Sequence, residues 1–304
     1  MSQPISSLMR GCRAVYPGRS PRAAWRRFGL IRAAIRHRSA TRRLLGGEPG
    51  SSLHTLLEER PEMLGVLVWP FICASWPVER RVEVIAGHCA VMDGADYLLR
   101  FSIGDKLSVI GLTDLHDGLR IILDRPRWFM REGQLVLNLF VGEFRAYSIA
   151  FSLHDEPGVG RVMYVGSIQG RNVPHALDLY RGLTKALFGV RPRDFVIELA
   201  RVFGRALGTE RMLCVSDAQR HHRHPYFSGK PVTGNYDEIW EQRGGIRYDA
   251  DFFELPLGQA RRDFETINPK KRSMYRQRFE LLDRIEAELP AGLRAGALER
   301  FDAT

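Results

Sequence analysis

Three histidines stand close together in the stretch QRHHRHP, at His221, His222 and His224. Closely spaced imidazoles can share a metal ion, and a neutral imidazole near the end of a strand can act as a general base. No cysteine or carboxylate accompanies these histidines at ligand spacing, so we expect no bound metal. A solvated basic loop is the plainer interpretation. The catalytic interpretation assigns the role of general base to His221 or His222.

A second candidate site is the stretch SIQGRNVPH, where a strand-like run ends and a helical pattern begins. The first amides of a helix have no partner within it and carry a partial positive charge. Gly170 would let a ligand approach the backbone, and Arg171 adds a cation. Gln169, Gly170, Arg171 and Asn172 could therefore hold a pyrophosphate or a carboxylate. The alternative is an ordinary strand-to-helix corner that Asn172 caps.

The stretch NYDEIWEQRGG predicts a short helix that Asn235 caps and two glycines end. Tyr236 and Trp240 lie one turn apart on the same side of this helix. Packing of both rings against a sheet is the plainer interpretation. As a catalytic residue, Tyr236 would protonate a leaving group.

Several motifs with well-defined chemistry are absent from the chain, among them GxxxxGK[ST], HExxH, GxGxxG and GxSxG. Their absence argues against the usual forms of P-loop nucleotidase, zinc peptidase, dinucleotide oxidoreductase and serine esterase. Four cysteines occur far apart, and none forms a CxxC pair. We expect them to be reduced, and Cys89 and Cys214 to be buried.

The elements that would position these residues follow a definite order. The runs LRIILD, QLVLNLFVG, RAYSIAFSL and RVMYVGSIQ predict strands, separated by REG, GE and HDEPGVG. Gly142 and Glu143 fit a two-residue hairpin turn, so an antiparallel meander is expected. A helix follows over 177–187, a second helix ends at Gly208, and RMLCVS is typical of a buried strand. The fold class predicted is α/β (α+β), with a mixed, mostly antiparallel central sheet and flanking helices.

Further helices are expected on both sides of the strands. Upstream, VERRVEVIAGHCAVM predicts an amphipathic helix. Downstream, IRYDADFFELPL predicts one strand and NPKKRSMYRQRFELLDRIEAEL a C-terminal helix. The linker candidate GGEPGSS separates residues 1–47, a basic helical arm, from residues 48–304, which we expect to form a single domain.

The arm carries 11 arginines and no acidic residue. The whole chain has 45 basic and 35 acidic residues, so residues 48–304 are nearly neutral. The stretch PRAAWRRFGLIRAAIRHR places Ala24, Phe28, Ile31 and Ile35 at helical spacing, beside Trp25. This apolar stripe could dock on the main domain, lie on an anionic membrane or bind nucleic acid. Nucleic acid is the weakest of these because no RNA-binding motif occurs.

The order of the elements resembles that of acyl-CoA-dependent N-acyltransferases. In that superfamily the pyrophosphate of the acyl carrier sits on the amides that open the central helix, and a base on a nearby strand deprotonates the amine. The resemblance implies that the loop 169–172 binds acyl-CoA or another acyl carrier. It also implies that His221 or His222 is the base and that Tyr236 protonates the leaving thiolate.

A second resemblance covers more of the chain. The stretches GSIQGRN, LTKALFGVRPRDF, NYDEIWEQRGG and KKRSMYRQRFELLDRI, in this order, are similar to the bacterial VirK/YbjX family over roughly residues 50–290. This resemblance implies a protein of Gram-negative bacteria that is associated with virulence and cell-envelope functions. The chain has no apolar run of membrane-spanning length and no secretory signal, so we expect a cytoplasmic protein, free or peripheral to the inner membrane.

Two functions remain open from the sequence. One is acyl-CoA-dependent N-acyl transfer to a small molecule or an envelope precursor. The other is a non-catalytic adaptor that residues 1–47 hold at the membrane and that affects export or modification of surface components.

Overall fold

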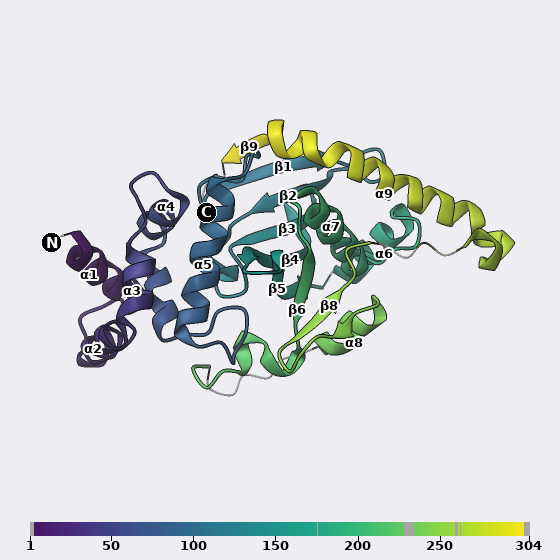
Figure 1. Cartoon of the computed structure of the whole chain (residues 1–304). Coiled ribbons are helices and arrows are strands. Elements are labelled where there is room, and N and C mark those ends of the chain that lie inside the picture. Colours follow the sequence, from purple (N-terminus) through teal and green to yellow (C-terminus); the bar gives the residue numbers. More distant parts are fainter. Residues whose placement is uncertain (1–2, 175, 228–233, 259–260, 262, 301–304) are drawn as a thin grey trace.

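A computed structural model describes residues 3–174, 176–227, 234–258, 261 and 263–300 of the chain. Its centre is one nine-stranded sheet in the order β7-β8-β6-β5-β4-β3-β2-β1-β9 (Figure 1). The strands are β1 Asp105–Gly111, β2 Leu119–Asp124, β3 Leu135–Val141, β4 Phe144–Glu156, β5 Gly160–Gly170, β6 Arg211–Val215, β7 Ile246–Arg247, β8 Phe252–Leu255 and β9 Ala297–Arg300. All neighbouring pairs are antiparallel except β5 and β6, which are parallel. The mixed, mostly antiparallel sheet expected from the sequence is confirmed.

Helices flank this sheet and extend beyond one side of it. The α-helices are α1 Gln3–Val15, α2 Pro21–Arg36, α3 Arg38–Leu45, α4 Ser52–Glu59, α5 Val78–Asp93, α6 Ala176–Ala186, α7 Pro192–Ala206, α8 Tyr236–Gln242 and α9 Pro269–Ala295. The 3-10 helices are η1 Pro61–Leu67, η2 Arg127–Phe129, η3 Asp217–Gln219, η4 His221–Arg223 and η5 Phe264–Thr266. Helices α1–α4 gather beside α5, away from the sheet, and α9 runs along the β1 edge (Figure 1). Among the described helices, none combines the length and apolar character needed to cross a bilayer.

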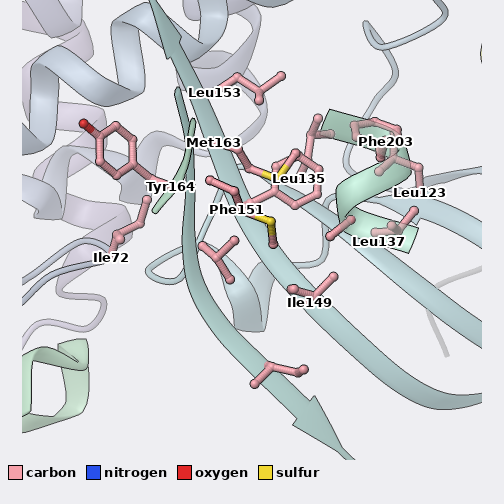
Figure 2. Close-up of a cluster of buried hydrophobic side chains, with 14 of the residues drawn as sticks. Ile72, Leu123, Leu135, Leu137, Ile149, Phe151, Leu153, Met163, Tyr164 and Phe203 are labelled. Atoms are coloured by element: carbon pink, nitrogen blue, oxygen red, sulfur yellow. The ribbon is translucent and has the colours of Figure 1, made fainter. Parts of the chain in front are cut away.

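Successive side chains of the central strands point to opposite faces of the sheet, so every second residue faces the same covering helix. Phe151 of β4 packs against Phe203 of α7, with ring centroids 5.4 Å apart (Figure 2). His154, three residues further along the same strand, lies against Gly87 of α5. Residues three apart on a strand point to opposite faces, so α5 and α7 cover the two faces of β4. The core therefore has a layer on each side of the sheet.

Local signals set most of the turns and helix ends. Gly142 has a φ of 55° and joins β3 to β4 in the two-residue turn that the sequence predicted. The Asn235 side chain accepts hydrogen bonds from the Asp237 and Glu238 amides, so the predicted cap of α8 is confirmed. All four cysteines are free and buried, as expected.

One expectation about the elements is wrong, and two strands were missed. The stretch IRYDADFFELPL forms two short strands, β7 and β8, because the chain turns back between them. Strands β1 and β9 were not predicted. Strand β9 pairs with β1 after α9 has crossed the sheet edge, so its partner comes from a distant part of the chain.

The structure shows which side of the helix in the arm is covered. Helix α2 packs on the protein through Ala23, Leu30 and Ala34, which are buried. The predicted stripe does not dock on the main domain as a whole, because Phe28 and Ile35 are exposed. Leu30 belongs to the same hydrophobic cluster as the sheet residues, which ties this helix to the main core.

Candidate acid–base site at the ends of β5 and β6

The two parallel strands diverge at their carboxyl ends. Strands β5 and β6 pair from Val162 with Arg211 to Val165 with Cys214. Beyond this point β6 ends, while β5 continues to Gly170. Ligand sites of sheets with parallel strands form at such carboxyl ends, where the strands part.

Helix α8 fills the wedge between the diverging strands. The Tyr236 hydroxyl accepts a hydrogen bond from the Ile168 amide at 3.0 Å and donates one to the Ile168 carbonyl at 3.1 Å. The Trp240 indole donates to the Val215 carbonyl at 2.9 Å. Both aromatic side chains are buried, and burial raises the pKa of the Tyr236 hydroxyl. Tyr236 can donate a proton to a ligand only when its contact with Ile168 opens.

A buried carboxylate, Glu132, lies beside this wedge. It belongs to the turn between η2 and β3. The Ser167 hydroxyl donates to Glu132 Oε2 at 2.5 Å, and the Gln169 side-chain amide donates to the same oxygen at 2.6 Å. The His221 Nε2 atom lies 3.6 Å from Glu132 Oε1. Strand β5 approaches this turn so closely that a Cβ at Gly166 would lie 2.0 Å from the Glu132 carbonyl oxygen.

Burial moves the pKa values of the two groups toward the neutral forms. Desolvation raises the pKa of Glu132 to about 7, against the opposing effect of the Ser167 hydrogen bond. Desolvation lowers the pKa of His221 well below 6.5, and the neighbouring His222 ring lowers it further. At neutral pH the imidazole of His221 is therefore uncharged, and the Glu132 carboxyl is close to the midpoint of its titration. Titratable groups tuned in this way are typical of sites that transfer protons.

The 3-10 helix η4 presents the histidines to this carboxylate. The His221 and His222 rings lie with their centroids 3.7 Å apart, and Phe227 contacts each of them at 5.5 Å. Asp217 fixes the start of the loop, because its carboxylate accepts from Arg220 at 3.2 Å and from Arg223 at 2.6 Å. His221 is buried and His222 is half-buried, so His222 lies nearer to solvent.

The same three residues could also be considered as metal ligands. The ligating atoms of Glu132, His221 and His222 lie within 4.8 Å of one another, and two imidazoles with one carboxylate suit several transition metals. However, the Arg131 and Arg220 guanidinium groups are close enough to act electrostatically on both Glu132 and His221. Two nearby cations disfavour a divalent ion beside a single carboxylate. We therefore interpret the cluster as a proton-transfer centre, and the absence of a metal stays a prediction.

The loop 169–172 connects this centre to a cleft on its other side. The Gln169 side chain reaches Glu132, whereas the Arg171 amide donates to the Tyr180 hydroxyl at 2.7 Å. Tyr147 and Tyr180 enclose Gly170 and line a cleft of about 430 Å³. Its other lining residues are Leu177, Arg181, Thr184, Arg191, Pro192 and Arg193. The cleft thus has an apolar wall and a rim of three arginines.

The structure brings together most of the residues that the sequence singled out. His221, His222 and Tyr236 lie around the wedge, and Gln169 joins them through Glu132. Gly170, Arg171 and Asn172 lie at the exposed end of β5, before α6 begins at Ala176. The Arg171 amide already has the Tyr180 hydroxyl as its partner.

Sequence reasoning missed Glu132. The sequence shows it only within REG, a stretch that reads as a turn between two strands. Nothing in its local pattern distinguishes it from a solvated turn residue. Its importance comes from tertiary contacts with residues on β5 and η4.

Comparison with known proteins places the chain among bacterial relatives. A family model described as protein of unknown function (DUF535) matches residues 19–291. The chain belongs to this DUF535 family. The "Uncharacterized protein YbjX" of Escherichia coli K12 is 27% identical over 294 residues, which cover 93% of this chain and 87% of that protein. No solved structure matches the chain.

A further relative covers part of the family region. An "Uncharacterized protein" of Haemophilus influenzae is 30% identical over 181 residues, which cover 59% of this chain and 60% of that protein. The resemblance to the YbjX family noted in the sequence is confirmed. The family match begins at residue 19, so it includes α2 and α3, which the sequence analysis left outside it.

Proposed function

We propose that the protein is an acyltransferase that moves an acyl group from acyl-CoA, or from a similar carrier, to an amine. The observation that carries the proposal is the position of the loop 169–172. On one side, Gln169 contacts the buried carboxylate Glu132 at 2.6 Å. On the other side, Gly170 and Arg171 contact Tyr180, which lines the cleft with three arginines. Consecutive residues of a strand point to opposite faces, so the cleft and the proton-transfer centre lie on opposite faces of β5 and meet at its carboxyl end. A carrier held in the cleft would reach the centre by passing its acyl end around this end of the strand.

The cleft suits the parts of an acyl carrier. Phosphate groups favour arginine because its planar guanidinium offers paired donors. Arg181, Arg191 and Arg193 line the cleft, and Leu177 and Tyr147 supply apolar contact for the rest of the carrier. A phosphate would compete with Asp178 for Arg181, which pair at 2.8 Å, and with Asp194 for Arg193, which pair at 2.9 Å. The resemblance of the element order to N-acyltransferases agrees with this position of the carrier, beside the helix that follows the central strand.

The acid–base centre then takes a proton from the acceptor amine. The amine nitrogen attacks the thioester carbonyl carbon, the new C–N bond forms, and the C–S bond breaks. The amine loses one proton to the imidazole of His222 or His221, and Glu132 stabilises the imidazolium that results. The thiolate leaves with the bonding electron pair and takes up a proton. Tyr236 is the donor for that proton if its contact with Ile168 opens during turnover.

Calorimetric titration tests the binding step. We expect acetyl-CoA, or a longer acyl-CoA, to bind the full chain with an affinity that falls at least tenfold in the Arg191→Gln, Arg193→Gln double variant. Arg261→Gln is the matched control, since Arg261 is an exposed arginine that also pairs with a carboxylate, Asp283, but does not line the cleft. If the titration shows no heat of binding at millimolar ligand, the proposal is refuted.

A thiol-release assay with a panel of amines tests the chemical step. His222→Gln and Glu132→Gln should each lower turnover by about 10²-fold or more, the usual contribution of a general base. His116→Gln is the control because His116 is a half-buried histidine, like His222, and lies in the turn before β2. Turnover that is unchanged in His222→Gln would refute the assignment.

A non-catalytic adaptor at the membrane is the second candidate function. It is favoured by the large apolar side chains that α2 exposes. Titration and turnover separate the two functions, because an adaptor would release no thiol.

A further inference from the structure

Helix α2 presents three large apolar side chains to solvent. Trp25 is 76% exposed, Phe28 is 59% exposed and Ile35 is 69% exposed. Their spacing places them on one side of the helix, opposite the buried residues Leu30 and Ala34. A large aromatic side chain at this degree of exposure is unusual, and a group of such residues marks an interaction surface.

The same side of the helix is strongly basic. Arg32 and Arg36 line a shallow depression of about 420 Å³ together with Trp25 and Phe28. Residues 1–47 contain 11 arginines and no acidic residue. The occupant of this surface must therefore offer both negative charge and an apolar interior.

We propose that this face of α2 docks on an anionic lipid bilayer, with the helix in the plane of the interface. Tryptophan and phenylalanine insert at the boundary of headgroups and acyl chains, while arginine holds the phosphates above it. The negative potential of such a surface attracts the basic arm before insertion. Duplex nucleic acid fits less well, because Phe28 and Ile35 would gain nothing from contact with a phosphate backbone. Helix α2 also lies at the end of the molecule away from the sheet, where a flat surface can reach it (Figure 1).

Contacts lead from α2 to the loop that carries the histidines. The Arg27 side chain donates to the Tyr16 carbonyl at 2.9 Å, and Tyr226 lies close enough to the Tyr16 hydroxyl to help raise its pKa, which burial raises most. Tyr226 packs against Phe227 at 5.2 Å, and Phe227 contacts His222. If the proposed acyl transfer holds, the docked helix lies next to the loop that bears the base. The amine acceptor would then be carried by a membrane lipid, an extension that rests on the proposed function.

Vesicle binding of the full chain tests the docking. We expect the wild type to sediment with vesicles of phosphatidylcholine containing 30% phosphatidylglycerol, and to bind pure phosphatidylcholine at least tenfold more weakly. The triple variant Trp25→Ser, Phe28→Ser, Ile35→Ser should lose at least tenfold in affinity for the anionic vesicles. Trp128→Ser is the matched control, since Trp128 is 66% exposed but lies in η2.

Two further measurements make the test specific to α2. The tryptophan emission of the wild type should shift to shorter wavelength on vesicle binding, and Trp25→Phe should remove this shift while Trp128→Phe retains it. The Arg32→Gln, Arg36→Gln variant should bind more weakly and show a smaller dependence on salt. Circular dichroism establishes that each variant is folded.

Clear outcomes would overturn the proposal. Equal vesicle affinity of the triple variant and the wild type would refute docking through this face. The proposal would also be refuted if the wild type bound a nucleic-acid duplex and did not bind vesicles, and if the triple variant lost this duplex binding. Glu132→Gln should bind vesicles like the wild type, so a failed acyl-transfer assay leaves the docking test unaffected.

Discussion

The buried carboxylate Glu132 makes a quantitative prediction about stability and pH. Burial raises the pKa of this group from 4.5 to about 7 in the folded protein. Between these values the folded protein holds a proton that the unfolded chain releases. The stabilising contribution is therefore fully present below pH 4.5 and is lost as the pH rises through 7. The whole effect corresponds to about 3 kcal/mol, and roughly 2 to 3 kcal/mol of it falls between pH 5 and pH 8.

Replacement of Glu132 by Gln removes the titration but keeps the shape. A glutamine carbonyl can accept the hydrogen bonds that Ser167 and Gln169 donate to Glu132 Oε2. The wild type should therefore lose roughly 2 to 3 kcal/mol more than Glu132→Gln when the pH is raised from 5 to 8. The lowered pKa of His221 costs stability as the pH falls below 6.5. At pH 5 Glu132 holds its proton, so His221 faces an uncharged group in both proteins, and its contribution to the comparison is small.

Urea unfolding followed by tryptophan fluorescence, at pH 5 and at pH 8, measures this difference. Glu288→Gln is the control because Glu288 is exposed on α9. Its free energy of unfolding should change with pH in the same way as that of the wild type. If Glu132→Gln also follows the wild type at both pH values, Glu132 is ionised and solvated in the folded protein. The acid–base centre would then lose its physical basis.

Two further substitutions probe the packing around the site. Gly166→Ala should destabilise the protein by about 3 kcal/mol, because its Cβ would lie 2.0 Å from the Glu132 carbonyl oxygen. Gly182→Ala, which has open space around its Cβ, should leave the thermal midpoint unchanged or raise it. Tyr236→Phe should cost about 1 to 3 kcal/mol, since both backbone groups of Ile168 lose their partner. Thermal unfolding measures all three, and midpoints of Gly166→Ala and Tyr236→Phe at the wild-type value would contradict the packing described here.

Elements with a local signature were predictable from the sequence. Helix α7, from Pro192 to Ala206, combines a proline in its first turn with an unbroken helical period. Strands β2 to β5 follow one another through short turns, and Gly142 sets one of these turns with its positive φ. Such signals depend on neighbours in the chain, so they can be recognised from the sequence without knowledge of the fold.

Elements that depend on a distant partner were not predictable. Strand β9 is only Ala297–Arg300, and it exists because β1 leaves an edge open for pairing. For a similar reason, the sequence left open which face of α2 is covered. A helical stripe of apolar residues shows that two faces differ, but only the neighbouring elements decide which face is covered. Here the smaller residues Ala23 and Ala34 are covered, and Trp25 is not.

The sequence by itself determined the mixed sheet, the helix that follows its central strand, the basic arm and the histidines near the wedge. Only the tertiary structure decided that Glu132 meets His221 and that Gln169 joins this pair to the cleft. The physical reason is desolvation. A carboxylate in a turn looks solvated in the sequence, and its pKa and chemistry change only when strands from elsewhere exclude water around it.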